Sequence, residues 1–316
     1  MEIRKPLVAN RGEIAIRVFR ACAAEAIATV AVVAPDDKGS LHARHASEVV
    51  EIGNYLHSEE HIRAAQRAGA DAIHPGYGFL AENADFAEAV EAAGLVFIGP
   101  TCDALRRGGD KLEAKRAAKG AGVPVLPTGE PEEIGFPLMI KAAAGGGGRG
   151  MRIVREPSGL PDAVAAAGRE AKAAFGDETL FFERYLERPR HVEIQKVLEE
   201  APSTALDPEL RRQMSDAAIA FAQAIGYRSL GTVEFLLDGG EFFFLELNGR
   251  IQVEHPVTEE ATGLDLVALQ LAIARGEPIA DPGATFRRHA VEVRLYAEDS
   301  VDFLPQAGTV ERLRLP

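Results

Sequence analysis

The chain has 316 residues, 47% of them apolar, which is enough for two or three domains with cores of their own. Its 48 acidic and 35 basic residues give a formal charge of −13, which argues against non-specific nucleic-acid binding. There is no apolar run long enough for a membrane span, no signal-peptide pattern in residues 1–10 and no metal or CxxC spacing at Cys22 and Cys102, so we expect a cytoplasmic protein with no membrane partner.

Residues 1–100 alternate between short β-branched runs and helical periodicity. This alternation predicts an α/β fold with a Rossmann-like parallel sheet and helices on both faces. The expected strands and helices are strands 5–9, 28–34, 71–74 and 95–98 and helices 13–25, 61–69 and 84–93. Because ligands bind such sheets beyond the carboxyl ends of the strands, segments 10–13 and 75–80 are expected at ligand depth.

A second pattern follows residue 100. Asp110 is placed to cap a helix over residues 111–120, and the Pro and Gly cluster at 123–131 indicates a connecting segment. The next expected elements are strand 138–141, a glycine loop, strand 151–154, helix 160–175 and strand 179–183. Two strands around a glycine loop predict a small lid.

Five of the six residues at 145–150 are glycine. Glycine costs conformational entropy, so this density favours a backbone that closes on phosphate over a plain surface turn. Met151 and Arg152 replace the Lys and Ser/Thr of a P-loop, and a strand rather than a helix follows, which excludes a Rossmann turn. We expect a glycine-rich hairpin over a nucleotide, with Lys141 at the end of the entering strand.

Residues 231–237 and 241–247 flank Asp238-Gly239-Gly240 and predict a β-hairpin. A two-residue loop would put Glu234 and Glu246 on opposite faces, whereas a three-residue loop, 239–241, would pair them directly. We prefer the three-residue loop because it also gives one clean apolar face, made of Val233, Phe235, Leu237, Phe243, Leu245 and Leu247. Facing carboxylates repel unless a cation joins them, and their hard oxygens suit Mg²⁺ or Mn²⁺ held against phosphates.

If the chain stays extended beyond Glu246, the same face carries Asn248, Arg250, Gln252 and Glu254. A solvated strand face usually favours Lys, Thr and Ser instead. A row of amides, acids and a guanidinium among apolar neighbours therefore indicates a binding or catalytic site.

Several motifs together make the chain resemble the biotin carboxylases, members of the ATP-grasp superfamily. They are VANRGEI (8–14), HPGYGFL (74–80), EN (82–83), GDK (109–111), KAAAGGGGRG (141–150), RHVEIQ (190–195), KVLEEAP (196–202) and NGRIQVEHP (248–256). The resemblance runs almost from end to end. It implies an N-terminal domain at 1–100, a linker and the start of the ATP-grasp core at 101–127, a lid at 128–186, and the rest of the core with the start of a C-terminal domain at 187–316.

The resemblance implies an ATP-dependent ligase that performs the first half-reaction of an acyl-CoA carboxylase. Bicarbonate attacks the γ-phosphate of MgATP to give carboxyphosphate, which yields CO₂ for N1′ of biotin. The implied partners are further copies of the chain, a biotin carboxyl carrier protein or domain, and a carboxyltransferase subunit. Two alternatives stay open, namely another ATP-grasp ligase of the carbamoyl-phosphate or carboxylate–amine type and an inactive ATP-binding fragment.

The resemblance also assigns roles to single residues. Glu254 would activate bicarbonate, Arg250 would bind it and later steady the biotin enolate, and Lys196 would lie over bicarbonate and the γ-phosphate. Bicarbonate binding would be completed by Gln252 and the Val253 backbone. Glu183 would accept the adenine amino group, and the full ATP set would be Lys111, Lys141, Gly145, Gly146, Gly147, Gly148, Gly150, Glu183, Leu186 and His191. The metal ligands would be Glu234 and Glu246, with Asn248 near the phosphates.

The chain departs from the family at three places. A strand-turn-strand segment that the family carries between Gln195 and Lys196 is absent, and the intact flanking motifs favour an omitted segment over a true deletion. The chain ends at Pro316, before a portion that in the family holds a further arginine for the biotin enolate and part of the dimer surface. Gly249 stands where Thr or a similar residue is usual in the family, and we expect it to point away from the site and to loosen the backbone.

Overall fold

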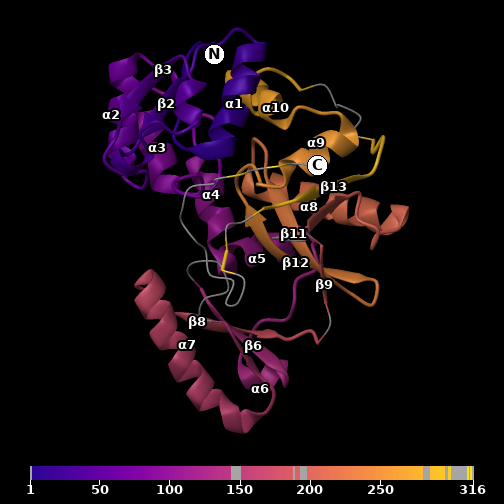
Figure 1. The fold of residues 1–316 in the computed structure, drawn as a ribbon. Helices are drawn as coiled ribbons and strands as arrows, with labels where there is room; N and C mark the ends of the chain where they lie inside the picture. Colours follow the sequence, from indigo (N-terminus) through magenta and orange to yellow (C-terminus); the bar gives the residue numbers. More distant parts are fainter. Residues whose placement is uncertain are drawn as a thin grey trace.

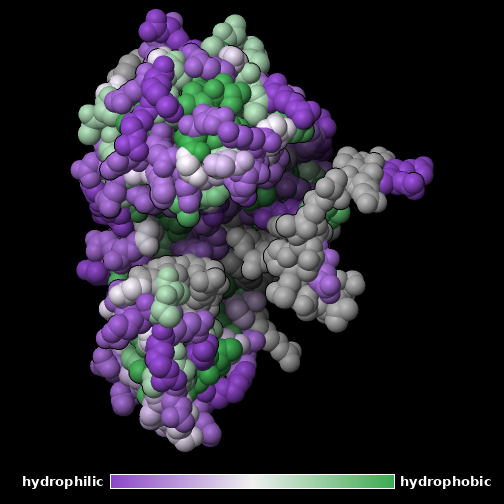
Figure 2. All heavy atoms as spheres, turned by 60° about the vertical axis from the view of Figure 1, so that its left-hand side comes forward, coloured by the Kyte–Doolittle hydropathy of each residue, from purple (hydrophilic) through white to green (hydrophobic). Residues whose placement is uncertain are grey.

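The computed structural model describes residues 2–143, 151–187, 189–192, 198–279, 285–295, 298–299, 312 and 314. Figure 1 shows an N-terminal sheet at one end, a small sheet at the other end and a β-hairpin with its helices between them. Hydrophilic side chains dominate the face drawn in Figure 2. In the described part of the chain, every helix is too short or too polar to cross a membrane.

The N-terminal region folds around a parallel sheet with the strand order β3-β2-β1-β4-β5. Its strands are β1 (Pro6–Val8), β2 (Val30–Val33), β3 (Glu48–Glu51), β4 (Ala72–His74) and β5 (Val96–Phe97). The connecting helices are α1 (Gly12–Ala24), α2 (Ser58–Ala68) and α3 (Ala84–Ala92), with 3-10 turns η1 (Pro35–Asp37) and η2 (His42–Arg44). The predicted Rossmann-like sheet is confirmed, although β3 was not predicted.

Both faces of this sheet are covered, because successive residues of a strand point to opposite sides. Leu7 packs in one core with residues of α2 and α3, whereas Val8 packs in a second core with residues of α1 and α10 (Leu266–Arg275). Figure 1 shows α10, from far along the chain, beside α1. Burial on both faces explains why β1 and β2 are continuous apolar runs.

The middle of the molecule is built from α4 (Cys102–Gly109), α5 (Lys111–Gly120), α8 (Pro208–Ile225) and the hairpin β11 (Thr232–Asp238) and β12 (Glu241–Asn248). Helices α5 and α8 enclose a core with the apolar face of the hairpin. Asp110 caps α5 as predicted, because its carboxylate accepts the backbone N–H groups of Leu112 and Glu113. Helix α4 was not predicted.

The lid has an antiparallel sheet in the order β7-β6-β8, with α7 packed on it. Its elements are α6 (Pro131–Ile134), β6 (Leu138–Ala142), β7 (Arg152–Val154), η3 (Pro157–Gly159), α7 (Leu160–Phe175) and β8 (Leu180–Arg184). The three predicted strands and the predicted helix of this region are confirmed. The lid is the lower lobe in both Figure 1 and Figure 2.

The remaining elements surround the hairpin. They are β9 (Arg190–Val192), β10 (Leu198–Ala201), α9 (His255–Thr262) and β13 (Ala290–Val293). Strand β9 pairs with β11, and β10 pairs with β13 in a separate two-stranded sheet. Helix α9 packs against this second sheet.

The hairpin corrects one prediction and confirms another. Glu234 and Glu246 are paired, as predicted, but Asp238 pairs with Glu241, so the turn has two residues rather than three. Gly239 and Gly240 both have positive φ, which such a turn requires. The register instead shifts by one residue between Glu234 and Phe235.

This shift leaves Leu245 without a partner, because Phe235 pairs with Phe244 and Glu234 pairs with Glu246. The bulge reverses the parity of β12 and so brings the two glutamates to one face. It also changes the predicted apolar face. Phe242 and Phe244 pack in the core with Phe235, in place of Phe243 and Leu245.

Candidate active site

The facing carboxylates form the acidic part of the site. Glu234 in β11 is buried, and the amide of Asn248 donates a hydrogen bond to it. Burial and the charge of Glu234 raise the pKa of Glu246, while Lys111 and Lys141 act in the opposite direction. A cation between the two carboxylates would relieve this repulsion.

This donor set fits Mg²⁺ or Mn²⁺, which prefer hard oxygen ligands. Among the described residues there is no group of three or more His, Cys, Asp or Glu side chains that could hold a metal ion by itself. Two carboxylates would therefore share the ion with phosphate and water oxygens, as is usual for magnesium at nucleotides.

Lys111 and Lys141 supply positive charge from two different parts of the molecule. Lys111 is the first residue of α5, and its position is fixed by the Asp110 cap. Lys141 lies in β6 of the lid and is buried. Burial, together with the charge of Lys111, lowers the pKa of Lys141 to about 8, and Glu246 counteracts this shift.

Glu183 in β8 is almost completely buried and contacts two lysines. Lys141 pairs with one of its carboxylate oxygens, and Lys115 of α5 pairs with the other. Burial lowers the pKa of Lys115, and the charges of Lys141 and Lys111 add to this effect. Lys115 was not predicted as a site residue.

The Arg250 segment differs from the predicted extended row. Strand β12 ends at Asn248, and the chain turns before α9 begins at His255. The turn still brings the side chains of Asn248, Arg250 and Gln252 together. Arg250 donates hydrogen bonds to Asn248 Oδ1 at 3.1 Å and to Gln252 Oε1 at 2.6 Å. Arg250 Nε also donates to Glu82 Oε2 at 3.1 Å, so Glu82 holds this guanidinium from the N-terminal domain.

Glu254 is the N-cap residue of α9 and is 8% exposed. One carboxylate oxygen pairs with Arg294, and the other is buried without a hydrogen-bond partner among the described residues. Arg294 follows β13 and was not predicted; the further arginine was expected only beyond Pro316. Its signal lay in the alternating segment 290–294, which ends at this arginine.

Other predicted residues are only partly described. Leu186 follows β8 and is half-buried, and Val253 lies in the turn before α9. The backbone of His191 lies in β9 opposite Leu236, but its side chain is outside the description. Lys196, Gly145, Gly146, Gly147, Gly148 and Gly150 lie outside the described residues.

Gly249 was predicted to point away from the site, and the structure agrees. A Cβ atom at this position would lie 2.9 Å from a side-chain carbon of Leu105 in α4. The looser backbone stays a prediction; Gly249 is buried, and its N–H donates to Glu82 Oε1 at 3.1 Å.

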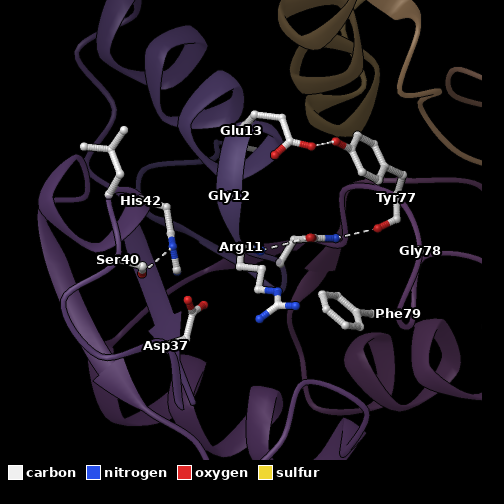
Figure 3. A pocket seen from close by; sticks show the side chains of 11 residues that line it. Arg11, Gly12, Glu13, Asp37, Ser40, His42, Tyr77, Gly78 and Phe79 are labelled. Carbon is white, nitrogen blue, oxygen red and sulfur yellow. Dashed lines mark hydrogen bonds between the residues drawn. The ribbon is translucent and has the colours of Figure 1, made fainter. Parts of the chain in front are cut away.

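The two N-terminal segments predicted at ligand depth line a cavity of about 440 Å³ (Figure 3). Arg11 lies 5.8 Å from the ring of Phe79, and the Tyr77 hydroxyl donates to Glu13. The buried amide of Asn10 donates to the carbonyls of Pro75 and Tyr77, so it joins the two segments. These contacts give the first motif a structural role at the carboxyl ends of the strands.

Two family models match the chain. Residues 2–105 match the N-terminal domain of biotin carboxylase, and residues 110–197 and 194–281 match the ATP binding domain of the carbamoyl-phosphate synthase L chain. The biotin carboxylase of Haemophilus influenzae is 45% identical, over 99% of this chain and 80% of the relative. A pyruvate carboxylase subunit of Methanothermobacter thermautotrophicus is also 45% identical, over 99% of this chain and 73% of the relative.

Solved structures agree. The biotin carboxylase domain of Hydrogenobacter thermophilus 2-oxoglutarate carboxylase, in complex with MgADP, ADP and bicarbonate, has a TM-score of 0.95 and 40% identity, over all of this chain and 80% of that chain. A biotin carboxylase from Campylobacter jejuni has a TM-score of 0.93 and 38% identity, over 96% of this chain and 78% of that chain. The fold is that of an ATP-dependent ligase. At this identity and coverage, the chain belongs to the biotin carboxylase family.

The comparisons also bear on the absent segment. The alignment with the Haemophilus influenzae relative spans 359 positions although this chain has 316 residues, so the relative carries residues that have no counterpart here. The ATP-binding model matches in two pieces that meet at residues 194–197. This junction coincides with the position where the segment was predicted to be absent.

Proposed function

We propose that this chain carboxylates biotin on a carrier protein, using MgATP and bicarbonate. The observation that carries the proposal is the buried Glu254 carboxylate, which has one oxygen on Arg294 and the other free of protein partners in the described structure. A carboxylate held in this way can accept a proton from a small substrate such as bicarbonate. Arg250 and Gln252 lie in the same turn and would bind that anion.

The proposed reaction joins two anions. Glu254 takes the proton of bicarbonate, whose oxygen then attacks the γ-phosphorus of ATP, and the bond to ADP breaks. The resulting carboxyphosphate yields phosphate and CO₂, and N1′ of biotin captures the CO₂ while its proton passes to the released phosphate. Lys111 and Lys141 would neutralise phosphate charge in the transition state, since positioned cations are the main catalytic resource of phosphoryl transfer.

Glu234 and Glu246 would hold a magnesium or manganese ion, with Asn248 beside them. When bound, the ion neutralises charge on the β- and γ-phosphates. On the nucleotide side, Glu183 would accept the adenine amino group beside the Leu186 backbone, and His191 would contact the ribose. Lys196 and the glycine loop complete the proposed set.

The partners are also part of the proposal. Some relatives are named as carboxylase subunits, one of a pyruvate carboxylase and another of a methylcrotonoyl-CoA carboxylase, which supports a biotin carrier and a carboxyltransferase as partners. We further propose a homo-oligomer in the cytoplasm. Both cysteines are free, as suits a reducing compartment. The domain boundaries predicted near residues 100, 127 and 186 stay proposals.

The test is ADP release that depends on both bicarbonate and free biotin. We expect Glu254→Gln to lower this turnover by about 10²–10⁴-fold, the usual contribution of a general base, with MgADP affinity nearly unchanged. Glu260→Gln is the matched control, because Glu260 is an exposed glutamate on the same helix.

Two outcomes would contradict the proposal. Full turnover in Glu254→Gln would remove the assignment of the base. If ADP release by the wild-type chain did not depend on biotin, the proposed carboxylation of biotin would be contradicted. Another ATP-grasp reaction would then be favoured.

A further inference from the structure

A buried lysine lies beside the proposed adenine site and has no role in the reaction described above. Lys115 is 6% exposed, although lysine is rarely buried without a partner. It lies four residues after Lys111 in α5, so the two side chains share one face of the helix. The Lys115 ammonium pairs with Glu183 and lies 5.5 Å from the centre of the Phe181 ring.

Lys115 and Lys141 reach Glu183 from different parts of the molecule. Lys141 is in β6 and Glu183 is in the neighbouring strand β8, so both belong to the lid sheet. Lys115 is in α5, which packs with α8 and β12 in the middle of the molecule. Glu183 is therefore paired with one lysine from its own sheet and with one from outside the lid.

Nucleotide binding changes this balance. In the proposed reaction Lys141 would pair with the phosphates instead, which would leave Glu183 with Lys115 as its cation. The phosphates also cancel the positive charges of Lys141 and Lys111, which otherwise disfavour a proton on Lys115. A positive charge on Lys115 is therefore most favourable when a nucleotide is bound and Glu183 has no other cation.

The charge state of Glu183 decides which base it can recognise. An ionised carboxylate only accepts hydrogen bonds, so it suits the amino group at C6 of adenine. A buried carboxylate without a cation takes up a proton and can then donate to a carbonyl oxygen at C6, as in hypoxanthine. The cation beside Glu183 therefore controls base selection.

We propose that Lys115 is a positioning residue that keeps Glu183 ionised and so makes the site select adenine over 6-oxopurine nucleotides. This inference rests on the proposed contact between Glu183 and the adenine amino group. Lys115 itself acts through Glu183.

The experiment compares the dissociation constants of MgADP and MgIDP on the full chain. We expect Lys115→Met to lower the preference for ADP by about ten-fold or more, the scale of one charged hydrogen bond. Lys115→Arg keeps the cation and should restore most of the preference. Lys119→Met is the matched control, since Lys119 is exposed one turn further along α5.

A double-variant comparison separates this role from a purely structural one. Glu183→Gln should itself reduce the preference for ADP, and adding Lys115→Met to it should change the preference no further. Should Lys115→Met fail to fold, Lys115→Gln is measured in its place. The proposal is overturned if the preference in the Lys115 variant stays within about two-fold of wild type, or if the Lys119 control shows the same loss.

The binding assay contains neither biotin nor bicarbonate. A chain that does not carboxylate biotin therefore still gives a valid result for Lys115. An unchanged preference in Glu183→Gln would instead show that the adenine contact is wrongly assigned, and the inference would fall with it.

Discussion

Substitution of Glu246 by Gln removes one charge from the carboxylate pair at the centre of the site. Glu246 lies directly opposite Glu234, and burial together with that neighbouring charge raises its pKa. The ionised form of Glu246 is therefore disfavoured in the folded protein. We expect the Gln variant to be more stable than wild type in buffer free of divalent metal, although it loses a proposed metal ligand.

The magnitude follows from the pairing. Directly opposed residues of antiparallel strands have Cβ atoms about 5 Å apart. Two unit charges at about 5 Å repel by about 3 kcal/mol at an effective dielectric constant of about 20. Lys111 and Lys141 attract Glu246 and offset part of this energy. The expected gain in the free energy of unfolding is about 1–2 kcal/mol.

Urea denaturation at pH 7.5 with a chelator measures this gain. Glu241→Gln is a close control, because Glu241 faces Asp238 across the same two strands but is exposed. Water screens that second pair, so its substitution should change stability by less than about 0.5 kcal/mol. Added Mg²⁺ and ATP should stabilise wild type more than the Glu246 variant.

The pH dependence has a definite sign. Because the pKa of Glu246 is raised on folding, the native state binds more protons than the unfolded chain between about pH 4.3 and the folded value. Wild type loses stability as pH rises through this window. The advantage of the variant should be absent below about pH 4 and complete above the folded pKa. Equal stability of the Glu246 and Glu241 variants at pH 7.5 would refute the reasoning.

Substitutions at three further positions test other parts of the site. Arg294→Met leaves the buried Glu254 carboxylate without its cation, so bicarbonate-dependent turnover should fall at least ten-fold while calorimetry shows unchanged MgADP binding. Gly249→Thr should lower the urea-measured stability by about 1–3 kcal/mol, because its Cβ would press on Leu105. Asp110→Ala should cost about 1 kcal/mol in the same assay and weaken MgATP binding, whereas Asp110→Asn, which keeps the cap, should cost little.

Local periodicity predicted the N-terminal sheet except β3 and most of the lid, but it gave no prediction for α4 or for the later helices α8, α9 and α10. Strand β3 lies at the edge of its sheet, which leaves it with alternating rather than continuous burial. Helix α4 ends in two glycines, which disfavour a helix. Gly108 nevertheless lies inside α4. Glycine is needed there because a Cβ atom would lie 2.5 Å from a side-chain carbon of Leu247. That close approach is a tertiary contact, so the local pattern could not show it.

The hairpin shows why a correct pairing can rest on an incorrect loop. Glu234 and Glu246 share a face only if one strand gains a residue relative to the other. A longer turn and a bulge both supply that residue, and alternation alone does not distinguish them. The bulge at Leu245 lets Phe244 pack on Phe221 with ring centres 4.6 Å apart. Packing of Phe244 against α8 therefore favours the bulge over the longer turn.

The two site residues that the sequence did not reveal have partners on distant elements. Lys115 meets Glu183 from the lid, and Arg294 meets Glu254 from a separate sheet. One of them had a usable signal, because the spacing of four residues puts Lys115 on the helix face of Lys111, which the resemblance had already assigned to phosphate. Arg294, which follows β13, had only the alternation of residues 290–294 as a signal, and no neighbour in the sequence indicated that it meets Glu254. Spacing within an element predicts which side chains point the same way, whereas the group they meet is set by how the elements pack.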